Sequence, residues 1–140
     1  IIFRPYLVYG PGQDVNRLIP YVIKNCLENK SFDCSSGEQY RDFIFIQDVI
    51  NIIFKSLKYR KAEGQIFNLC SGQPVQIKKL IYLIRNKIKK GKPKLGKIKL
   101  RKDEILKFYG SADKTYKFFN YKLKIKFNQG LKKTIDYFRD

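Results

Sequence analysis

Short apolar runs alternate along the chain with longer segments in which apolar residues recur every three or four positions. The continuous apolar runs are typical of buried strands and occupy residues 1–8, 43–46 and 65–70, with a shorter one at 32–34. The helical spacing predicts four helices, at residues 17–29, 47–59, 75–89 and 129–138. Strands that alternate with helices predict an α/β fold.

The first two helices allow predictions about single residues. Asn16 is expected to cap the helix at 17–29 through its side chain, with Pro20 in the first turn. The helix at 47–59 is expected to turn one apolar face inward, and that face is formed by Val49, Ile50, Ile53, Phe54 and Leu57.

The second half of the chain is rich in lysine. Residues 89–96, KKGKPKLG, predict a basic loop, and Ile98 and Leu100, which alternate with lysines, predict a half-exposed strand. Asp113 is expected to cap a short helix that ends near Phe119. Asn120 should then adopt the left-handed conformation that ends many helices, because asparagine tolerates it best after glycine.

Composition narrows the class of protein. With 140 residues, 44% of them hydrophobic, the chain can form one domain with a core, and no apolar run approaches the ~20 residues that span a bilayer. The three cysteines form no CxxC pair, which argues against a disulfide framework and a zinc site. The chain has no histidine for a catalytic triad. We therefore expect a cytoplasmic protein that makes no membrane contact.

The formal net charge of +18 suggests an anionic partner. One interpretation is a basic module that binds nucleic acid, since aromatic residues that can stack on bases alternate with lysines between residues 107 and 127. The other is a compositional skew, because lysine and isoleucine are abundant while alanine occurs only at positions 62 and 112. We expect the second, in which lysine is a default surface residue and the positive field attracts an anionic substrate.

Two blocks carry more specific information: FRPYLVYGPG at residues 3–12 and GEQYRDFIFIQDV at residues 37–49. The first is an extended apolar run that ends in a Gly-Pro-Gly turn, and the second places Arg41 beside Asp42 before a β-prone run and a helix start. Together they resemble the extended short-chain dehydrogenase/reductase family, whose enzymes epimerise, dehydrate or reduce nucleotide sugars. In that family a Tyr-Gly-Pro turn likewise precedes a Gly-x-Gln-x-Arg-Asp-Phe block.

The resemblance implies the outer strands of a Rossmann-type parallel sheet plus a small C-terminal substrate-binding domain. The family also carries a Gly-rich dinucleotide fingerprint and a catalytic Tyr-x-x-x-Lys pair, and neither pattern occurs here. Residues 1–140 are therefore expected to be the C-terminal portion of an NAD(P)-dependent epimerase, dehydratase or reductase. This portion should contain no catalytic residue and no metal site, bind no NAD or NADP alone, and be inactive alone.

The expected partners follow from the same resemblance. They are a nucleotide diphosphate sugar and, for the protein surface, either the missing N-terminal part or a second copy of the chain. A third interpretation is a non-catalytic remnant that persists as the folded partner of another chain.

The resemblance also assigns site residues. Arg41 is expected to grip the diphosphate of the nucleotide sugar, because a planar guanidinium binds phosphate oxygens in bidentate fashion. Arg101 and Glu104 match the family's Arg-x-Gly-Asp/Glu segment, which approaches the diphosphate from the other side, although Asp103 replaces the glycine. The alternatives are an Arg41–Asp42 surface pair and a solvated Arg101.

Further contacts with the nucleotide sugar are expected from Arg17, Leu18 and Phe32, and a solvated side chain is the alternative for Arg17. The two apolar residues match positions from which the family shapes its base pocket, and burial in the core is the alternative for both. The segment around the Tyr-Gly-Pro turn is expected to border NAD or NADP in the full-length enzyme through Tyr6, Gly10 and Pro11. Leu7 stands where many members of the family have an asparagine that holds the sugar.

Overall fold

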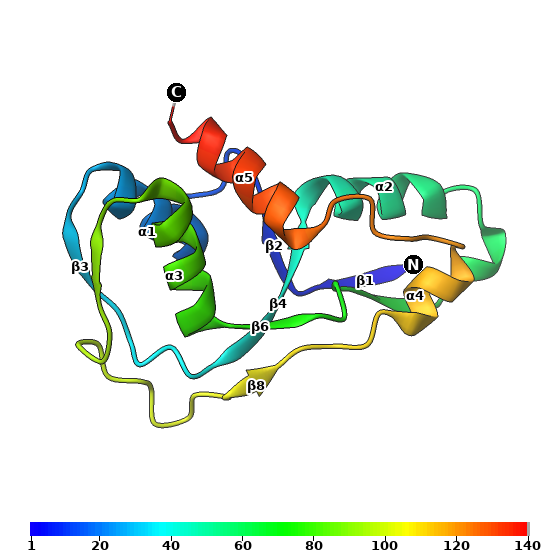
Figure 1. The fold of residues 1–140 in the computed structure, drawn as a ribbon. Helices are drawn as coiled ribbons and strands as arrows, with labels where there is room; N and C mark the ends of the chain where they lie inside the picture. The colour runs from blue at the N-terminus through cyan, green and yellow to red at the C-terminus, as the bar shows by residue number, and fades with distance from the viewer. Residues whose placement is uncertain (140) are drawn as a thin grey trace.

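The computed structural model describes residues 1–139 and contains three short groups of strands (Figure 1). The first is the parallel pair of β1 (Ile2–Pro5) and β5 (Ile66–Leu69). The second consists of β2 (Leu7–Tyr9), β4 (Tyr40–Phe45), β6 (Pro74–Gln76) and β8 (Lys107–Phe108). The third is the parallel pair of β3 (Ser31–Asp33) and β7 (Lys92–Lys94).

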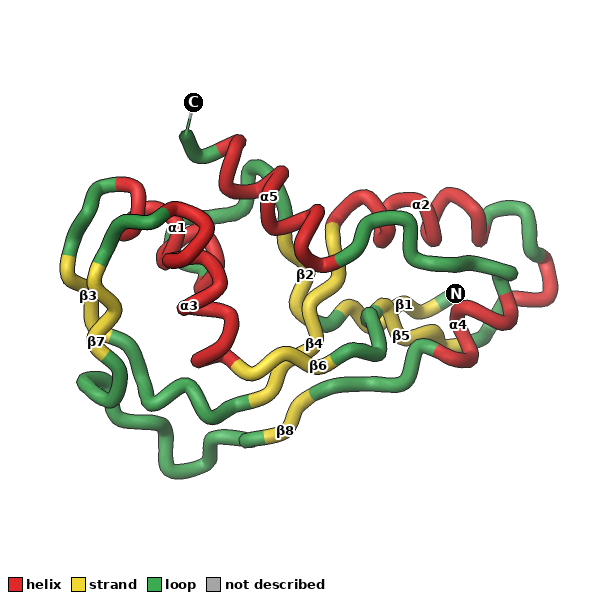
Figure 2. Tube along the Cα trace, in the orientation of Figure 1, coloured by secondary structure: helices red, strands yellow, loops and turns green. Residues whose placement is uncertain are grey.

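Helices flank these strands on several sides (Figure 2). Within residues 1–139 they are α1 (Leu18–Leu27), α2 (Ile46–Ser56), α3 (Ile77–Ile88), α4 (Asp113–Phe118) and α5 (Phe127–Tyr137), with a 3₁₀ turn at Arg60–Ala62. The molecule is elongated, with α1 and α3 at one end and α2 and α4 at the other (Figure 1). The predicted α/β fold with parallel strands is confirmed.

The strand expected at residues 1–8 is divided at Tyr6. Before this residue β1 pairs with β5, and after it β2 pairs with β4, so the chain changes its pairing partner at Tyr6. The backbone N–H of Tyr6 still donates to Leu69 O at 3.0 Å. The division follows Pro5 directly, which agrees with the inability of proline to donate to a strand ladder.

The central strand β4 separates two hydrophobic cores. Successive side chains of a strand point to opposite faces, so Phe43 and Phe45 join one core while Ile44 joins the other. The first core contains the packed faces of α1 and α3 and the inner face of α5. The second lies beneath α2 and α4 and is centred on Phe67 and Phe119, which are both fully buried.

The prediction for the inward face of α2 is wrong for four of its five residues. Val49 is buried, together with Ile52 and Ser56 one and two turns further on. The exposed fractions of the other predicted residues are 37% for Ile50, 39% for Ile53, 66% for Phe54 and 75% for Leu57. The helix is apolar on two faces, and only one of them finds a partner within residues 1–139.

Other local predictions have mixed outcomes. The short helix α4 forms as expected, but its cap residue is Ala112 and Asp113 is its first helical residue. Asn16 does not cap α1: the cap residue is Arg17, and the backbone N–H of Asn16 donates to Asp14 Oδ1 at 2.7 Å. Ile98 and Leu100 form no strand, because β7 forms earlier, inside the expected loop, by pairing with β3. Asn120 does adopt the predicted left-handed conformation, with φ of 43°.

Candidate functional site

A cavity of about 380 Å³ lies between the end of β2 and the start of α1. It brings together three of the predicted residues, Tyr6, Arg17 and Leu18. The rest of its lining comes from Pro5, Leu7, Val8, Tyr9, Gln13, Ile19 and Phe43. The cavity is thus largely apolar, with one cationic side chain at its wall.

The guanidinium of Arg41 is held by three acceptors. Its Nη1 donates to Tyr40 O and to Ile105 O, both at 2.8 Å, and its Nη2 forms an ion pair with the carboxylate of Glu104. Both partners of this ion pair are mostly buried, with side-chain exposures of 16% and 21%. The structure therefore joins two predicted substrate-binding residues, Arg41 and Glu104, directly to each other.

Residues 101–108, here called the strap, connect Arg41 to the cavity. The strap ends in β8, which pairs with β4 so that Phe108 lies opposite Arg41. The ring of Phe108 stacks on that of Tyr6 with 5.2 Å between centroids, and Tyr6 lines the cavity. Arg101 lies at the start of the strap with an exposed side chain, and its O accepts the backbone N–H of Glu104 at 3.2 Å.

Asp42 does not pair with Arg41, so the expected alternative of a surface ion pair between them is wrong. The carboxylate of Asp42 is fully buried and accepts two backbone N–H groups, from Ser71 at 2.6 Å and from Gly72 at 2.8 Å. It therefore fixes the turn after β5. Neighbouring residues on a strand face opposite sides, which explains why Arg41 and Asp42 have different partners.

Asp48 forms a second buried carboxylate network, which sequence reasoning missed. Its oxygens accept the hydroxyl of Tyr121 at 2.6 Å and the backbone N–H groups of Lys124 and Ile125 at 2.9 and 3.2 Å. Burial and the bond to Asp48 raise the pKa of Tyr121 above its usual value, so this hydroxyl remains a donor. The start of α2 is thereby tied to the segment that leads into α5.

The remaining predicted residues lie apart from the cavity. Phe32 is 4% exposed and meets Tyr21 edge to face in the first core, which fits the alternative of core burial. Gly10 is buried, and a Cβ on it would lie 2.5 Å from the side chain of Ile46. Pro11 is exposed at the turn that follows.

Groups that could act as nucleophiles or acids are deeply set. The thiols of Cys26, Cys34 and Cys70 are buried, and burial raises the pKa of each to about 11, so they stay protonated at neutral pH. Burial, with the charge of Asp48, also raises the pKa of Tyr9 far above its usual range. These three thiols and the hydroxyl of Tyr9 therefore remain protonated at neutral pH.

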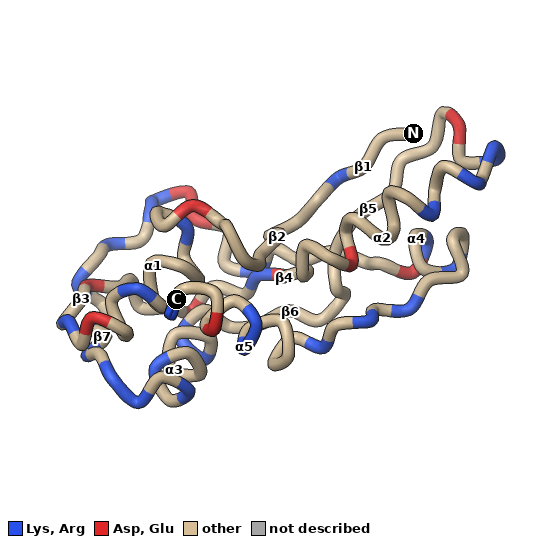
Figure 3. The backbone as a smooth tube through the Cα atoms, turned by 90° about the horizontal axis from the view of Figure 1, so that it is seen from above, with Lys and Arg blue, Asp and Glu red and all other residues tan. Residues whose placement is uncertain are grey.

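The structure disfavours the nucleic-acid interpretation. Two aromatic residues of the segment 107–127, Phe119 and Tyr121, are buried in the second core and cannot stack on bases. Lysines and arginines are also spread over both ends of the molecule rather than gathered on one element (Figure 3).

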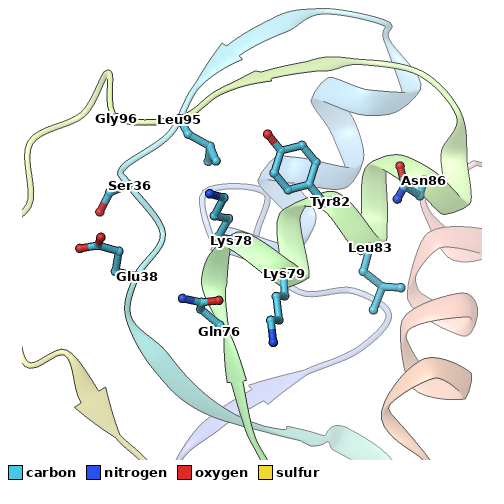
Figure 4. A pocket seen from close by; sticks show the side chains of 10 residues that line it. All are labelled: Ser36, Glu38, Gln76, Lys78, Lys79, Tyr82, Leu83, Asn86, Leu95 and Gly96. Atoms are coloured by element: carbon cyan, nitrogen blue, oxygen red, sulfur yellow. The ribbon is translucent and has the colours of Figure 1, made fainter.

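A second, larger cavity of about 780 Å³ contains none of the predicted residues. Figure 4 shows it between α3, which contributes Lys78 and Tyr82, and the segment that contains Ser36 and Glu38.

None of the helices within residues 1–139 has the length and apolar character that are needed to span a membrane. The same residues contain no cluster of three metal-ligating side chains of the His, Cys, Asp or Glu type.

Residues 1–70, which include β1 to β4 and the Arg41 block, match the model of the NAD dependent epimerase/dehydratase family. The chain belongs to this family. The chain is similar to CDP-abequose synthase from Salmonella typhimurium, to which it is 32% identical over 135 residues. This alignment covers 91% of the chain and 44% of the synthase. A UDP-glucuronate 4-epimerase from Thermodesulfobacterium geofontis is 29% identical over 141 residues, or 99% of the chain and 43% of the epimerase.

Solved structures agree with the family assignment. The UDP-glucuronic acid 4-epimerase from Bacillus cereus, in complex with UDP-glucuronic acid and NAD, has a TM-score of 0.89 at 25% identity. The structural match includes 99% of this chain and 45% of the Bacillus cereus epimerase. An epimerase from Methanothermobacter thermautotrophicus has the same fold, with a TM-score of 0.89 at 22% identity over 98% of this chain and 42% of its own. The family member described here thus spans less than half the length of these relatives.

Proposed function

We propose that this chain is the nucleotide-sugar-binding portion of an NAD(P)-dependent epimerase, dehydratase or reductase, in which Arg41 binds the diphosphate. The observation that supports this most is the placement of Arg41. It lies mostly buried on β4, in the block that carries the family resemblance, beside a strap that contains a second arginine. Phe43, two residues further on the same face of β4, lines the cavity.

We further propose that the residues of this chain bind no NAD or NADP by themselves. A dinucleotide pyrophosphate needs a Gly-rich turn that opens a helix, and α1 instead begins after Arg17, well beyond the packed Gly10 turn. We therefore assign no hydride-transfer step to residues of this chain. In the proposal, the N-terminal part of a complete enzyme supplies NAD or NADP and the catalytic pair, and this portion contributes the substrate site.

The proposal is tested by replacing Arg41. In the complete enzyme, titration calorimetry with UDP-, CDP-, GDP- and dTDP-sugars should show that Arg41→Ala weakens the binding free energy by about 1.5–3 kcal/mol, because a hydrogen bond to a charged group is removed. Arg41→Lys should recover only part of the lost affinity, since an ammonium group lacks the planar pair of N–H donors with which a guanidinium binds phosphate oxygens. The exposed Arg60 provides a control, and Arg60→Ala should bind as the original chain does. Equal affinities for Arg41→Ala and the original chain would contradict the proposal.

Glu104 should compete with the ligand for Arg41. A diphosphate must displace this carboxylate, so Glu104→Gln is expected to tighten nucleotide-sugar binding, by roughly tenfold if one charged hydrogen bond is released. Asp103→Asn removes the same charge from the neighbouring, exposed residue of the strap and should have little effect. Weaker binding by Glu104→Gln would instead show that the carboxylate itself holds the ligand.

A further inference from the structure

A third cavity, of about 990 Å³, lies between α2 and the segment that connects α4 to α5 (Figure 1). It shares no lining residue with the 380 Å³ cavity beside Arg17. Its lining contains no aspartate, glutamate or arginine, and it contains four lysines, which are Lys55, Lys58, Lys122 and Lys124. We call this cavity the lysine groove. The 780 Å³ cavity differs from it, because its two lysines are accompanied by Glu38.

The ammonium group of Lys55 joins the two walls of the lysine groove. Lys55 belongs to α2, and its Nζ donates to Asn120 O at 2.8 Å in the connecting segment. Both residues line the groove, and this hydrogen bond is exposed to solvent. An ammonium carries three N–H donors, and the bond to Asn120 uses one of them. Lys55 is therefore a cation that is held in place where a ligand can reach it.

The other three lysines surround this fixed cation with exposed side chains. A lysine carries a compact charge on a flexible stem, so these ammonium groups can turn toward an anion without a change of the backbone. The carboxylate of Asp48, which bonds to Tyr121 in the lining, is fully buried and already accepts three donors. A cleft lined by charges of one sign concentrates ions of the opposite sign. The groove is thus built to attract an anion.

The lysine groove does not coincide with the exposed apolar face of α2. Lys55 and Lys58 are three residues apart and share one side of the helix, whereas Ile50, Ile53 and Leu57 share another. A protein that covers the apolar face therefore need not cover the lysines.

The number and kind of these charges define the ligand. Four ammonium groups around one groove repel one another, and an anion with several charges relieves this repulsion. Linked phosphate groups place several charges within a short chain, and lysine binds phosphate as a point charge. We propose that the lysine groove binds a small anion that carries several phosphate groups, as an inorganic polyphosphate or a nucleoside triphosphate does. This site is separate from Arg41, so it stands independently of the proposed nucleotide-sugar site.

Titration calorimetry with inorganic tripolyphosphate tests the site. The triple variant Lys58→Gln, Lys122→Gln, Lys124→Gln should weaken tripolyphosphate binding by roughly 10- to 100-fold, because three exposed charge contacts are lost. Uridine triphosphate should show the same dependence on this variant. Orthophosphate and citrate should bind more weakly than tripolyphosphate to the unaltered chain, since neither carries linked phosphates.

A second triple variant controls for net charge. Lys90→Gln, Lys97→Gln, Lys99→Gln removes the same charge from exposed lysines outside the groove lining, and it should change the affinity for tripolyphosphate by less than about threefold. Tripolyphosphate should also shift the backbone amide resonances of Lys122 and Lys124 in the unaltered chain. This measurement needs no variant and locates the ligand directly.

Four results would overturn the proposal. Equal losses in the two triple variants would mean that the overall charge, and not the groove, attracts the anion. Equal binding of citrate, orthophosphate and tripolyphosphate would contradict the class of ligand. A single-stranded oligonucleotide that binds more tightly than tripolyphosphate, and loses more affinity in the groove variant, would assign the lysines to nucleic acid instead. Unchanged amide resonances of Lys122 and Lys124 would exclude the groove, even if the groove variant does not fold.

Discussion

Replacement of Asp48 by alanine is expected to lower the free energy of unfolding by about 3–5 kcal/mol, because it leaves one buried and two partly buried donors without their acceptor. These donors are the Tyr121 hydroxyl and the backbone N–H groups of Lys124 and Ile125. A typical domain is stable by only about 5–15 kcal/mol, so the loss is a large fraction of the total. Thermal unfolding followed by circular dichroism should show a melting temperature lower by roughly 10–20 °C.

Two further variants serve as references for the destabilisation caused by Asp48→Ala. Tyr121→Phe removes one of the three donors and leaves the carboxylate, so it should destabilise by only about 1 kcal/mol. Asp136→Ala removes an exposed carboxylate whose ion pair with Arg139, at 3.5 Å, lies in solvent, and it should be nearly neutral. If Asp48→Ala melts at the temperature of Asp136→Ala, the buried network has no structural role.

The role of Asp48 could not be predicted from the sequence. An acidic residue in the first turn of a helix is common, because it interacts favourably with the helix N-terminus. That local explanation accounts for Asp48 without any distant partner. Its partners are 73 to 77 residues away, and no periodicity or motif connects them.

Helical periodicity predicted which helices exist but could not orient α2. The spacing of Val49 and Ile52 and the spacing of Ile50, Ile53, Phe54 and Leu57 both describe an apolar stripe. The choice between the two stripes depends on which one meets the sheet. That information comes from the packing of β4 and β5, not from the helix itself.

Non-local strand pairing explains the other errors. β7 forms because Lys92–Lys94 runs beside Ser31–Asp33, a pairing that spans about sixty residues and overrides the loop-like composition of KKGKPKLG. The candidate site shows the same limit. The motifs marked Arg41 and Glu104 as substrate-binding residues, and only the fold shows that the two side chains form an ion pair with each other.

The isolated chain of 140 residues is expected to self-associate through α2. Ile50, Ile53, Phe54 and Leu57 form an exposed apolar stripe, and β1 pairs only with β5 among the described residues, which leaves a strand edge open nearby. In the proposed complete enzyme, the N-terminal part covers these groups. In the absence of the N-terminal part, the apolar stripe of a second copy of the chain can cover the same groups. The net charge of +18 makes two copies repel each other. Self-association is therefore expected at high salt, where this repulsion is screened.

Sedimentation at high salt tests this expectation with two matched variants. Phe54→Lys with Leu57→Lys adds two charges to the stripe and should give a monomer. Ile98→Lys with Tyr137→Lys adds the same charges at two residues that are each 51% exposed elsewhere, and this variant should associate as the original chain does. The original chain should also bind a hydrophobic dye. A dye-negative monomer at high concentration would show that the α2 stripe and the β1 edge need no cover, and the proposal that this chain is one portion of a larger sheet would then be wrong.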